Sequence, residues 1–361
     1  MVLVQGANGQ GKSNLLEAIY ILAVAKSHRA STERQLIRRQ SITNESFAQI
    51  AGSINREGDT TKLQVDFSWM TSPSSEYHDL RVKKYVHVNG VRRRGSELVG
   101  EMNAVLFTAD DLNLVYGSPT IRRRYLDILI SQTDREYLKT LQRYQRIVTN
   151  RNHLLKEIRD RRSKESELTI WDDQLADAGA LILTRRANTL ARLSDTATQT
   201  HNDLSEANEI LMVKYQPSIP STGSSPQQIG DEIRETLEVV RSKEIAQGVC
   251  LRGPHRDDFM LLLGDTSVND YASRGQARTV ILALKLAEAQ HLQEVRGSKP
   301  IILLDDVLSE LDTTRRSQVL ERAAGYEQTI VTTADIGLVP IEHRHSALDL
   351  VTAGGKVRRS P

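Results

Sequence analysis

The first residues of the chain hold the feature that most restricts its fold, a glycine-rich loop between a short strand and a helix. Residues 6–13 read Gly-x4-Gly-Lys-Ser, follow the β-branched run 2–4, and precede apolar residues with helical spacing between 15 and 22. This order is typical of a P-loop, in which glycines let backbone N–H groups turn toward an anion and the helix adds its N-terminal dipole. Phosphate is the ligand that suits this geometry. An ordinary glycine-rich turn is the alternative.

The residues of this loop have distinct expected roles. Lys12 is expected to place its charge on the β- and γ-phosphates of a nucleotide, and the Ser13 hydroxyl to complete the ligand shell of Mg²⁺. The predicted nucleotide site consists of Gly6, Ala7, Asn8, Gly9, Gln10, Gly11, Lys12 and Ser13.

A second part of the nucleotide site is indicated near the end of the chain. Residues 300–304 are an apolar run typical of a buried strand, and Asp305 and Asp306 follow it in a Walker-B arrangement. Asp305 is expected to hold the hydration shell of Mg²⁺, and Asp306 to orient and partly deprotonate the attacking water. Lys12 and Asp306 are therefore the predicted catalytic residues. Two acids that cap a helix are the alternative explanation of the same pattern.

A third anion-binding candidate precedes an amphipathic helix expected over residues 280–289. Ser273, Gly275 and Gln276 form a Ser-x-Gly-Gln sequence at the start of this helix. Such a sequence presents a hydroxyl, free backbone N–H groups and a positive dipole toward an anion.

Composition limits the remaining classes of function. Lys and Arg number 48 and Asp and Glu 46, for a formal charge of +2, so any surface for nucleic acid must be local. A single cysteine, Cys250, excludes an internal disulfide and indicates a reducing compartment. The chain lacks a run of about 18 apolar residues and a signal-peptide pattern, so we expect a cytoplasmic protein with no membrane partner. The nine histidines lack metal-ligand spacing, which leaves Mg²⁺ with nucleotide as the indicated metal.

Between these motifs the pattern changes twice. Residues 34–94 alternate strand-like runs with turns, including a hairpin at 88–91, and predict an antiparallel β-layer. Residues 120–206 show two helical stripes separated by a charged turn, which predicts an antiparallel pair of helices, each of about 24 residues and roughly 35 Å long. A loop is expected over 216–228 and a strand-like run at 249–252.

Basic residues gather at four places that either contact phosphates or are solvated faces. These are residues 92–94, 122–124, 161–162 and 185–186.

The order of the motifs resembles that of the ABC-type ATPases of the SMC and Rad50 group, and most closely the RecF family. The matching segments are residues 6–18, 26–29, 111–127, 253–258, 271–276 and 303–312.

This resemblance implies an α/β fold: an ABC-type P-loop ATPase head, with a mixed sheet and an antiparallel β-layer, plus an inserted short helical arm domain. The head would comprise residues 1–112 and 207–361, and the arm residues 113–206. It also implies an ATP-dependent homodimer, in which Ser273, Gly275 and Gln276 of one subunit reach the phosphates held by the P-loop of the other. The activity expected is a weak DNA-dependent ATPase used as a switch.

By the same resemblance, the closed dimer holds DNA at junctions of single and double strands. RecO and RecR are the expected protein partners, and recombinase loading, replication-fork maintenance and induction of the SOS response the expected roles.

The sequence departs from the family pattern at two points. The family carries about 25 residues before the P-loop strand, which form strands beside the nucleotide. Here Met1 begins that strand, so we expect an incomplete N-terminus that affects folding and adenine contacts. Ser13 stands where Thr is usual, a conservative change.

Two other classes of function remain as alternatives. The nucleotide-binding subunit of a transporter would lack an inserted arm, so residues 120–206 argue against it. A nucleotide-dependent structural module that does not hydrolyse ATP remains open, because Asp306 stands where ABC ATPases usually carry Glu.

Overall fold

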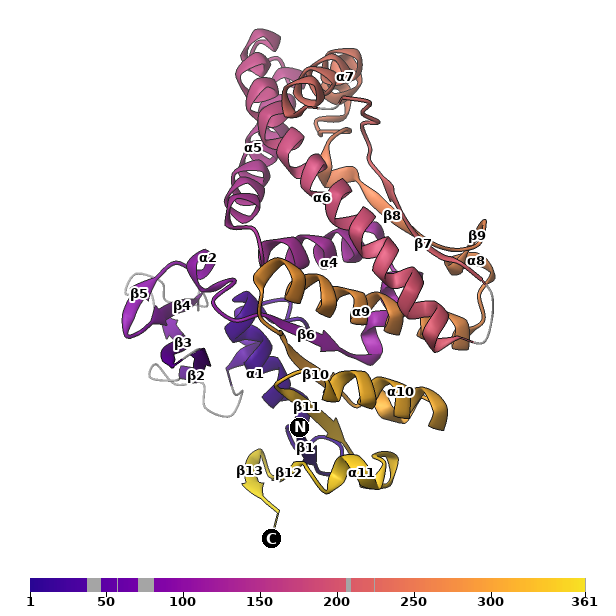
Figure 1. The fold of residues 1–361 in the computed structure, drawn as a ribbon. Coiled ribbons are helices and arrows are strands. Elements are labelled where there is room, and N and C mark those ends of the chain that lie inside the picture. Colours follow the sequence, from indigo (N-terminus) through magenta and orange to yellow (C-terminus); the bar gives the residue numbers. More distant parts are fainter. Residues whose placement is uncertain (38–46, 57, 71–80, 206–208, 224, 361) are drawn as a thin grey trace. The chain divides into compact units, whose positions relative to one another are not determined.

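The strand that precedes the P-loop lies inside a sheet of six strands. Strand β1 (Val2–Gln5) pairs in parallel with β11 (Thr329–Thr333) on one side and β12 (Leu348–Ala353) on the other. The strand order is β13-β12-β1-β11-β10-β6, and the β12–β13 pair is antiparallel, which makes the sheet mixed (Figure 1). The remaining strands are β6 (Ala104–Phe107), β10 (Ile301–Asp305) and β13 (Lys356–Arg359).

The computed structural model of the protein describes residues 1–361 except 38–46, 57, 71–80, 206–208, 224 and 361. The described chain forms two units. One comprises Met1–Ala109 and Leu292–Pro361 and holds the six-stranded sheet, and the other comprises Asp110–His291.

The helices of the first unit cover both faces of this sheet. Connections between parallel strands are almost always right-handed, so their direction along the sheet decides the face on which the helix lies. Helix α1 (Lys12–Val24) leads toward the β6 edge, whereas α10 (Thr313–Ala324) and α11 (Ile341–Arg344) lead toward the β13 edge. Helix α1 accordingly packs on β6, β10 and β11, and α10 and α11 lie on the other side of the strands (Figure 1).

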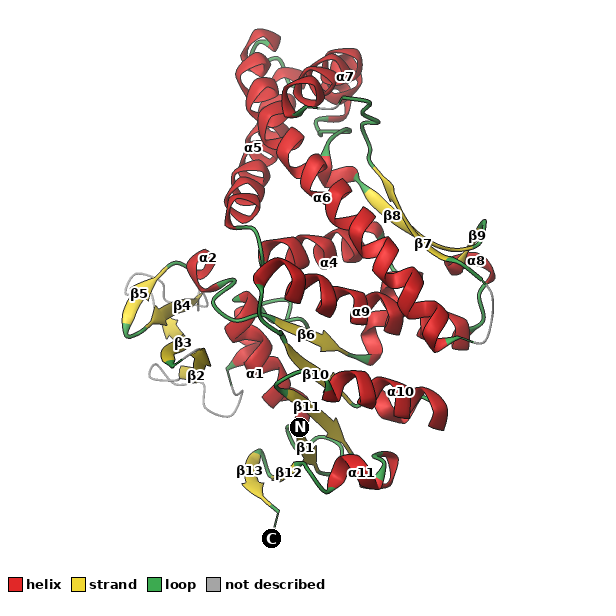
Figure 2. Ribbon diagram, in the orientation of Figure 1, coloured by secondary structure: helices red, strands yellow, loops and turns green. Residues whose placement is uncertain are grey.

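A second, antiparallel sheet in this unit confirms the predicted β-layer. Its order is β2-β3-β4-β5, and α1 packs against β2 and β3 (Figure 2). The predicted hairpin at 88–91 is present, with positive φ at Asn89 and Gly90, as a tight hairpin turn requires. The strands are β2 (Phe47–Arg56), β3 (Asp59–Met70), β4 (Arg81–Val88) and β5 (Val91–Arg93).

The second unit is built around a long antiparallel helix pair. Helix α5 (Arg135–Arg159) has the predicted length, and α6 (Leu168–Leu204) packs along it. Helix α6 has 37 residues, which at about 1.5 Å per residue makes it roughly 55 Å long, well beyond the predicted 35 Å. Helix α7 (Pro226–Gln247) packs on both. Since α7 follows Ser225, whose Oγ accepts the Gln228 N–H, the helix begins inside the predicted loop.

A three-stranded sheet completes this unit, in the order β7-β8-β9. Strand β7 also packs on α6, so residues beyond the predicted arm boundary at 206 belong by compactness to the same unit as the helix pair. The division into head and arm by function remains a prediction. The strands are β7 (Leu211–Gln216), β8 (Asp258–Leu263) and β9 (Thr266–Ser267).

The predicted strand at 249–252 is wrong. These residues form no strand, because side chains satisfy their backbone: the Cys250 N–H donates to Asn152 Oδ1 at 2.6 Å, and the Leu251 N–H to Glu244 Oε1 at 2.7 Å. Glu244 also accepts from the buried Arg151, whose Nη1 lies 2.6 Å from its Oε2. The buried ion pair of Arg151 and Glu244 therefore holds residues 249–252, for which a strand was expected.

The described residues also form the helices α2 (Gly95–Leu98), α3 (Asn113–Tyr116), α4 (Pro119–Ser131), α8 (Val268–Tyr271) and α9 (Arg274–Arg296). The 3₁₀ turns are η1 (Glu33–Leu36), η3 (Ala109–Leu112), η4 (Glu165–Glu167), η5 (Pro254–Arg256), η6 (Val307–Glu310) and η7 (Ile336–Leu338).

Candidate nucleotide site

The P-loop connects β1 to α1. Gly9 and Gly11 have φ of 79° and 103°, a region that glycine adopts without Cβ strain, and Gly11 is the residue from which α1 starts. The buried Lys12 side chain turns back over the loop, and its Nζ donates to the Gly6 carbonyl at 2.6 Å and the Ala7 carbonyl at 3.2 Å. A cation is thus held at the centre of the loop that the sequence predicts to bind phosphate.

The two predicted Mg²⁺ ligands lie together. Ser13 Oγ donates to Asp305 Oδ1 at 2.9 Å, although the residues are 292 positions apart. A hydroxyl in the first turn of α1 and a carboxylate at the end of β10 supply the hard oxygen donors that Mg²⁺ prefers, so these residues fit that ion.

Thr332 is a residue of this site that the sequence pattern did not reveal. It is fully buried on β11, and its Oγ1 donates to Asp305 Oδ1 at 2.8 Å and accepts from the Asp306 N–H at 3.0 Å. The Thr332 hydroxyl therefore holds both the side chain of Asp305 and the backbone of Asp306. The available signal was a threonine at the carboxyl end of a predicted strand, where ligand sites of parallel sheets lie.

Asp306 has a left-handed backbone, with φ of 53° and ψ of 20°. It precedes the turn η6, but its side chain accepts no hydrogen bond from the backbone there, so the helix-cap explanation of the two acids gains no support. Asp306 directly follows β10 and the carboxylate that contacts Ser13, and its own Oδ2 accepts a hydrogen bond from Ser309 Oγ at 3.4 Å.

The β12–β13 hairpin lies against the P-loop. The Gly354 N–H donates to Gln10 Oε1 at 2.7 Å, and Thr352 Oγ1 donates to the Gln5 carbonyl at 3.1 Å. A Cβ at Gly6 would come within 2.3 Å of Thr352 Oγ1, so glycine is required there for packing. The hairpin thus contacts the chain just before the P-loop, at Gln5, and inside the P-loop, at Gln10.

The predicted Ser273-x-Gly275-Gln276 motif belongs to the second unit, at the start of α9. The Ser273 N–H donates to Gln276 Oε1 at 2.9 Å, and the Gln276 N–H to Ser273 Oγ at 3.2 Å, a reciprocal capping box. Ser273 and Gly275 are exposed. The start of this long helix is therefore ordered and accessible to an anion. Since the motif and the P-loop belong to different units, its role at the phosphates stays a prediction.

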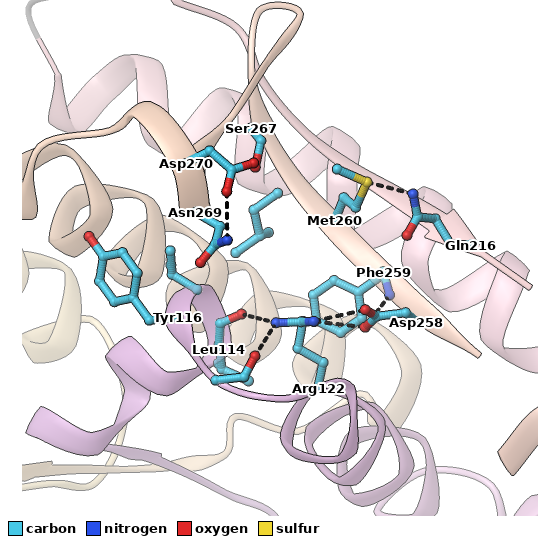
Figure 3. A pocket seen from close by; sticks show the side chains of 13 residues that line it. Leu114, Tyr116, Arg122, Gln216, Asp258, Phe259, Met260, Ser267, Asn269 and Asp270 are labelled. Atoms are coloured by element: carbon cyan, nitrogen blue, oxygen red, sulfur yellow. Dashed lines mark hydrogen bonds and ion pairs between the residues drawn. The ribbon is translucent and has the colours of Figure 1, made fainter. Parts of the chain in front are cut away.

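A pocket of about 270 Å³ lies beside α8, just before this motif (Figure 3). Arg122 lies in it, paired through Nε and Nη2 with Asp258 at 2.7 and 2.8 Å. Its Nη1 donates to the Leu114 and Gly117 carbonyls. These bonds hold the Arg122 guanidinium in place within the second unit.

Two absences apply to the described residues. Their His, Cys, Asp and Glu side chains form no group of three that could hold a metal ion. Within the same part of the chain, helices of sufficient length are too polar to cross a membrane.

The P-loop, the acid-ended strand beside it, the mixed sheet and the antiparallel β-layer define the head of an ABC-type P-loop ATPase. The family model of the RecF/RecN/SMC N-terminal domain matches residues 1–352. The chain belongs to the RecF family.

Its relatives cover nearly the full chain. A protein of Bacillus subtilis (strain 168) named DNA replication and repair protein RecF is 39% identical over 337 residues, which are 92% of this chain and 87% of the relative. A protein of the same name from a Cyanothece strain is 37% identical over 359 residues, 99% and 92% of the two chains.

Solved structures agree in fold. The recombination mediator protein RecF of the RecFOR pathway, solved with ATPrS, has a TM-score of 0.87 at 30% identity and covers 99% of this chain and 91% of its own. A structure of RecF with ATP has the same TM-score and identity, and covers 100% and 91%. The Smc head domain of Pyrococcus yayanosii has a TM-score of 0.50 at 13% identity and covers 99% and 92%, a likeness of fold alone.

Proposed function

We propose that this chain is an ATP-dependent DNA-binding protein of recombinational repair and replication-fork maintenance. The observation that carries the proposal is the contact between Ser13 Oγ and Asp305 Oδ1, because it joins the P-loop to the acid-ended strand in one nucleotide site. The names of its relatives, DNA replication and repair protein RecF, support the choice of DNA as the partner.

In this proposal the site binds ATP with Mg²⁺. Lys12 exchanges its bonds to the Gly6 and Ala7 carbonyls for the β- and γ-phosphates, since these offer the stronger, charged acceptors. Ser13 and Asp305 would hold Mg²⁺, and the bound ion would neutralise charge that develops on the phosphates. Asp306 accepts a proton from the attacking water while its backbone is held by Thr332. The shorter reach of Asp306 compared with Glu favours slow hydrolysis.

ATP then acts as a switch for assembly. Ser273, Gly275 and Gln276 are proposed to contact the γ-phosphate bound by a second copy of the chain, which closes a homodimer. Their place at the exposed start of a long helix supports this, because backbone N–H groups and the helix dipole there favour an anion. Hydrolysis removes the γ-phosphate and opens the dimer.

The closed dimer is proposed to hold DNA at junctions of single and double strands, with RecO and RecR as partners in recombinase loading. SOS induction would follow from that loading, and the cytoplasm would be its place of action. The reference to the RecFOR pathway in the solved structures of RecF supports these partners.

A nucleotide-dependent module without hydrolysis is the second candidate, favoured by the aspartate at position 306. Release of phosphate from ATP in the presence of DNA separates the two, because only the switch turns over.

The experiment that tests the proposal measures binding to DNA and assembly together. Fluorescence anisotropy with labelled single-stranded, duplex and junction DNA would be recorded with and without ATP–Mg²⁺, and light scattering would give the mass of the protein. We expect tight DNA binding and a doubled mass only with ATP–Mg²⁺. DNA binding that ignores ATP, or a mass that stays that of one chain, would reject the clamp.

A further inference from the structure

The antiparallel sheet β2–β5 presents one apolar and one polar face. On β3 the alternate residues Leu63, Val65, Phe67 and Trp69 are buried, so the residues between them point to the opposite face. We propose that this opposite face, the outer face, binds the phosphate backbone of the nucleic acid. The inference rests on the proposed DNA binding and assigns a surface to it.

The strand register identifies the charged members of the outer face. Lys62 lies on it because its neighbour Leu63 is buried. Ser68 and Gln64 of β3 also point to this face, and paired residues of neighbouring strands share a face. Lys83 pairs with Ser68 and therefore lies on the outer face. His87 pairs with Gln64, and Arg92 pairs with His87, so Arg92 lies on it as well. The side chains of Lys62, Lys83 and Arg92 are exposed. From residue 62 to residue 68 the strand spans about 20 Å, so the cations follow a path long enough for several nucleotides.

Among the described residues, Asp66 is the carboxylate that the register places on this face, and it is already engaged. Asp66 Oδ1 accepts from Gln49 Nε2 at 2.8 Å and from Gln64 Nε2 at 3.0 Å, and its Oδ2 lies 3.3 Å from His87 Nδ1. Its oxygens thus already accept hydrogen bonds from side chains of the same sheet. Lys62, Lys83 and Arg92 therefore leave the described outer face positive, which complements a polyanion.

Arg92 and two aromatic side chains add contacts that suit a nucleic acid. The Arg92 guanidinium lies over the Tyr85 ring, 4.5 Å from its centroid, an arrangement that holds the planar group flat and leaves its edge for phosphate. Phe47, opposite Ser68 on the same face, is 69% exposed. An exposed aromatic ring beside these cations is a platform on which a base can stack.

The other basic clusters are largely used inside the second unit. Arg186 is buried against Asp127 and Asp257, and Arg185 pairs with Asp134 at 2.9 Å. Arg162 pairs with Glu157 and Asp160, as Arg122 does with Asp258. These pairs reduce the charge available for phosphate, so the outer face of β2–β5 is the better candidate.

The test is the triple variant Lys62→Ala, Lys83→Ala, Arg92→Ala, whose changes are all at exposed positions. Its control, Arg143→Ala, Lys214→Ala, Lys243→Ala, removes three exposed cations of the second unit. DNA affinity would be measured with ATP–Mg²⁺ over a range of salt concentrations, and nucleotide affinity and the melting temperature for every variant.

We expect the outer-face variant to lose at least tenfold in DNA affinity. Its slope of log affinity against log salt should fall by about two to three, because each phosphate contact adds roughly 0.7 for single strands and 0.9 for duplex. The control should keep the wild-type slope. Equal slopes in all three proteins, or an equal loss in both variants, would overturn the inference.

Two arms of the experiment identify the form of DNA. If the triple variant loses affinity for single-stranded DNA and Phe47→Ala does so too, the face binds single strands with stacked bases. If the triple variant loses affinity for duplex DNA alone, the face binds duplex phosphates. If the wild-type chain binds ATP but no DNA, the proposed function itself is wrong. If the wild-type chain binds DNA and the triple variant binds it equally well, only the assignment of this surface is wrong.

Discussion

The hydroxyl of Thr332 lies 2.8 Å from Oδ1 of Asp305 and so fixes, from the neighbouring strand, the carboxylate that contacts the P-loop. Thr332→Val keeps the shape but removes this donor and the acceptor for the Asp306 N–H. We expect affinity for nucleotide with Mg²⁺ to fall about tenfold, and stability to fall by about 1 kcal/mol, because the partly buried Asp306 N–H loses its acceptor.

Two variants separate positioning from stability at Thr332. Thr332→Ser keeps the hydroxyl and should restore Mg²⁺-dependent binding. Thr329→Val removes a buried hydroxyl at the other end of the same strand, which donates to the Ala323 carbonyl, so it should lower stability alone. Titration of a fluorescent nucleotide with and without Mg²⁺ checks this, and equal Mg²⁺ dependence in Thr332→Val and Thr329→Val would contradict the role.

Lys12 is the residue on which nucleotide binding should depend most. Lys12→Met keeps the length and burial of the side chain but removes the cation that now bonds the Gly6 and Ala7 carbonyls. We expect nucleotide affinity to fall at least 100-fold, and ATP-dependent doubling of mass to disappear with it. Isothermal titration and light scattering measure the two effects. Assembly without nucleotide binding would argue against an ATP-dependent dimer.

Asp306 should separate ATP binding from hydrolysis. Its φ of 53° is tolerated by Asp and Asn better than by most residues, so Asp306→Asn removes the proton acceptor with little backbone strain. We expect at least tenfold slower phosphate release, unchanged ATP affinity and a dimer that persists with ATP. Asp306→Ala is a poorer choice, because strain at this position would lower stability as well. A monomeric, nucleotide-free Asp306→Asn protein would count heavily against the assignment.

Gln10 should act on the nucleotide through the shape of the loop. Its Oε1 accepts the Gly354 N–H of the β12–β13 hairpin at 2.7 Å. Gln10→Met removes the acceptor at similar size, and we expect nucleotide affinity to fall three- to tenfold through faster dissociation. Gln10→Glu keeps an acceptor and should recover the dissociation rate in part. Stopped-flow release of a fluorescent nucleotide measures the rates, and equal rates for wild type and Gln10→Met would show that the contact is incidental.

The sequence predicted those parts of the site that are written in contiguous residues. The P-loop, the acids after β10, the hairpin at Asn89-Gly90 and the helix pair each have a local pattern, set by backbone chemistry or by the period of apolar residues. Thr332 and the Gln10–Gly354 contact have none, because they depend on which strands become neighbours in the sheet.

Long-range packing also explains two of the differences between the predicted and observed elements. Residues 249–252 have the apolar character of a strand, but Asn152 and Glu244 take up their backbone N–H groups. Helix α6 continues past the predicted stripe because α7 and β7 bury its additional turns. Neither partner is identifiable from the local pattern.

His255 gives the fold a defined dependence on pH. Burial lowers its pKa to about 4, a change that nearby arginines reinforce and that the hydrogen bond to the Cys250 carbonyl opposes. Its Nδ1 lies 2.7 Å from the Tyr144 hydroxyl, and its Nε2 lies 3.2 Å from that carbonyl. The folded protein therefore holds this imidazole neutral, between a hydroxyl donor and a carbonyl acceptor.

Between pH 6.5 and pH 4 the unfolded chain binds a proton at His255 that the folded chain does not, so folding loses stability as the pH falls. The contribution is complete above about pH 6.5 and decreases by about 1.4 kcal/mol per pH unit toward pH 4. Because carboxylates also titrate in this range, the measurement is the difference in unfolding free energy between wild type and His255→Gln from urea denaturation at several pH values. We expect this difference to shrink on acidification, since the variant has no proton to bind, and a constant difference would show that position 255 does not titrate on unfolding.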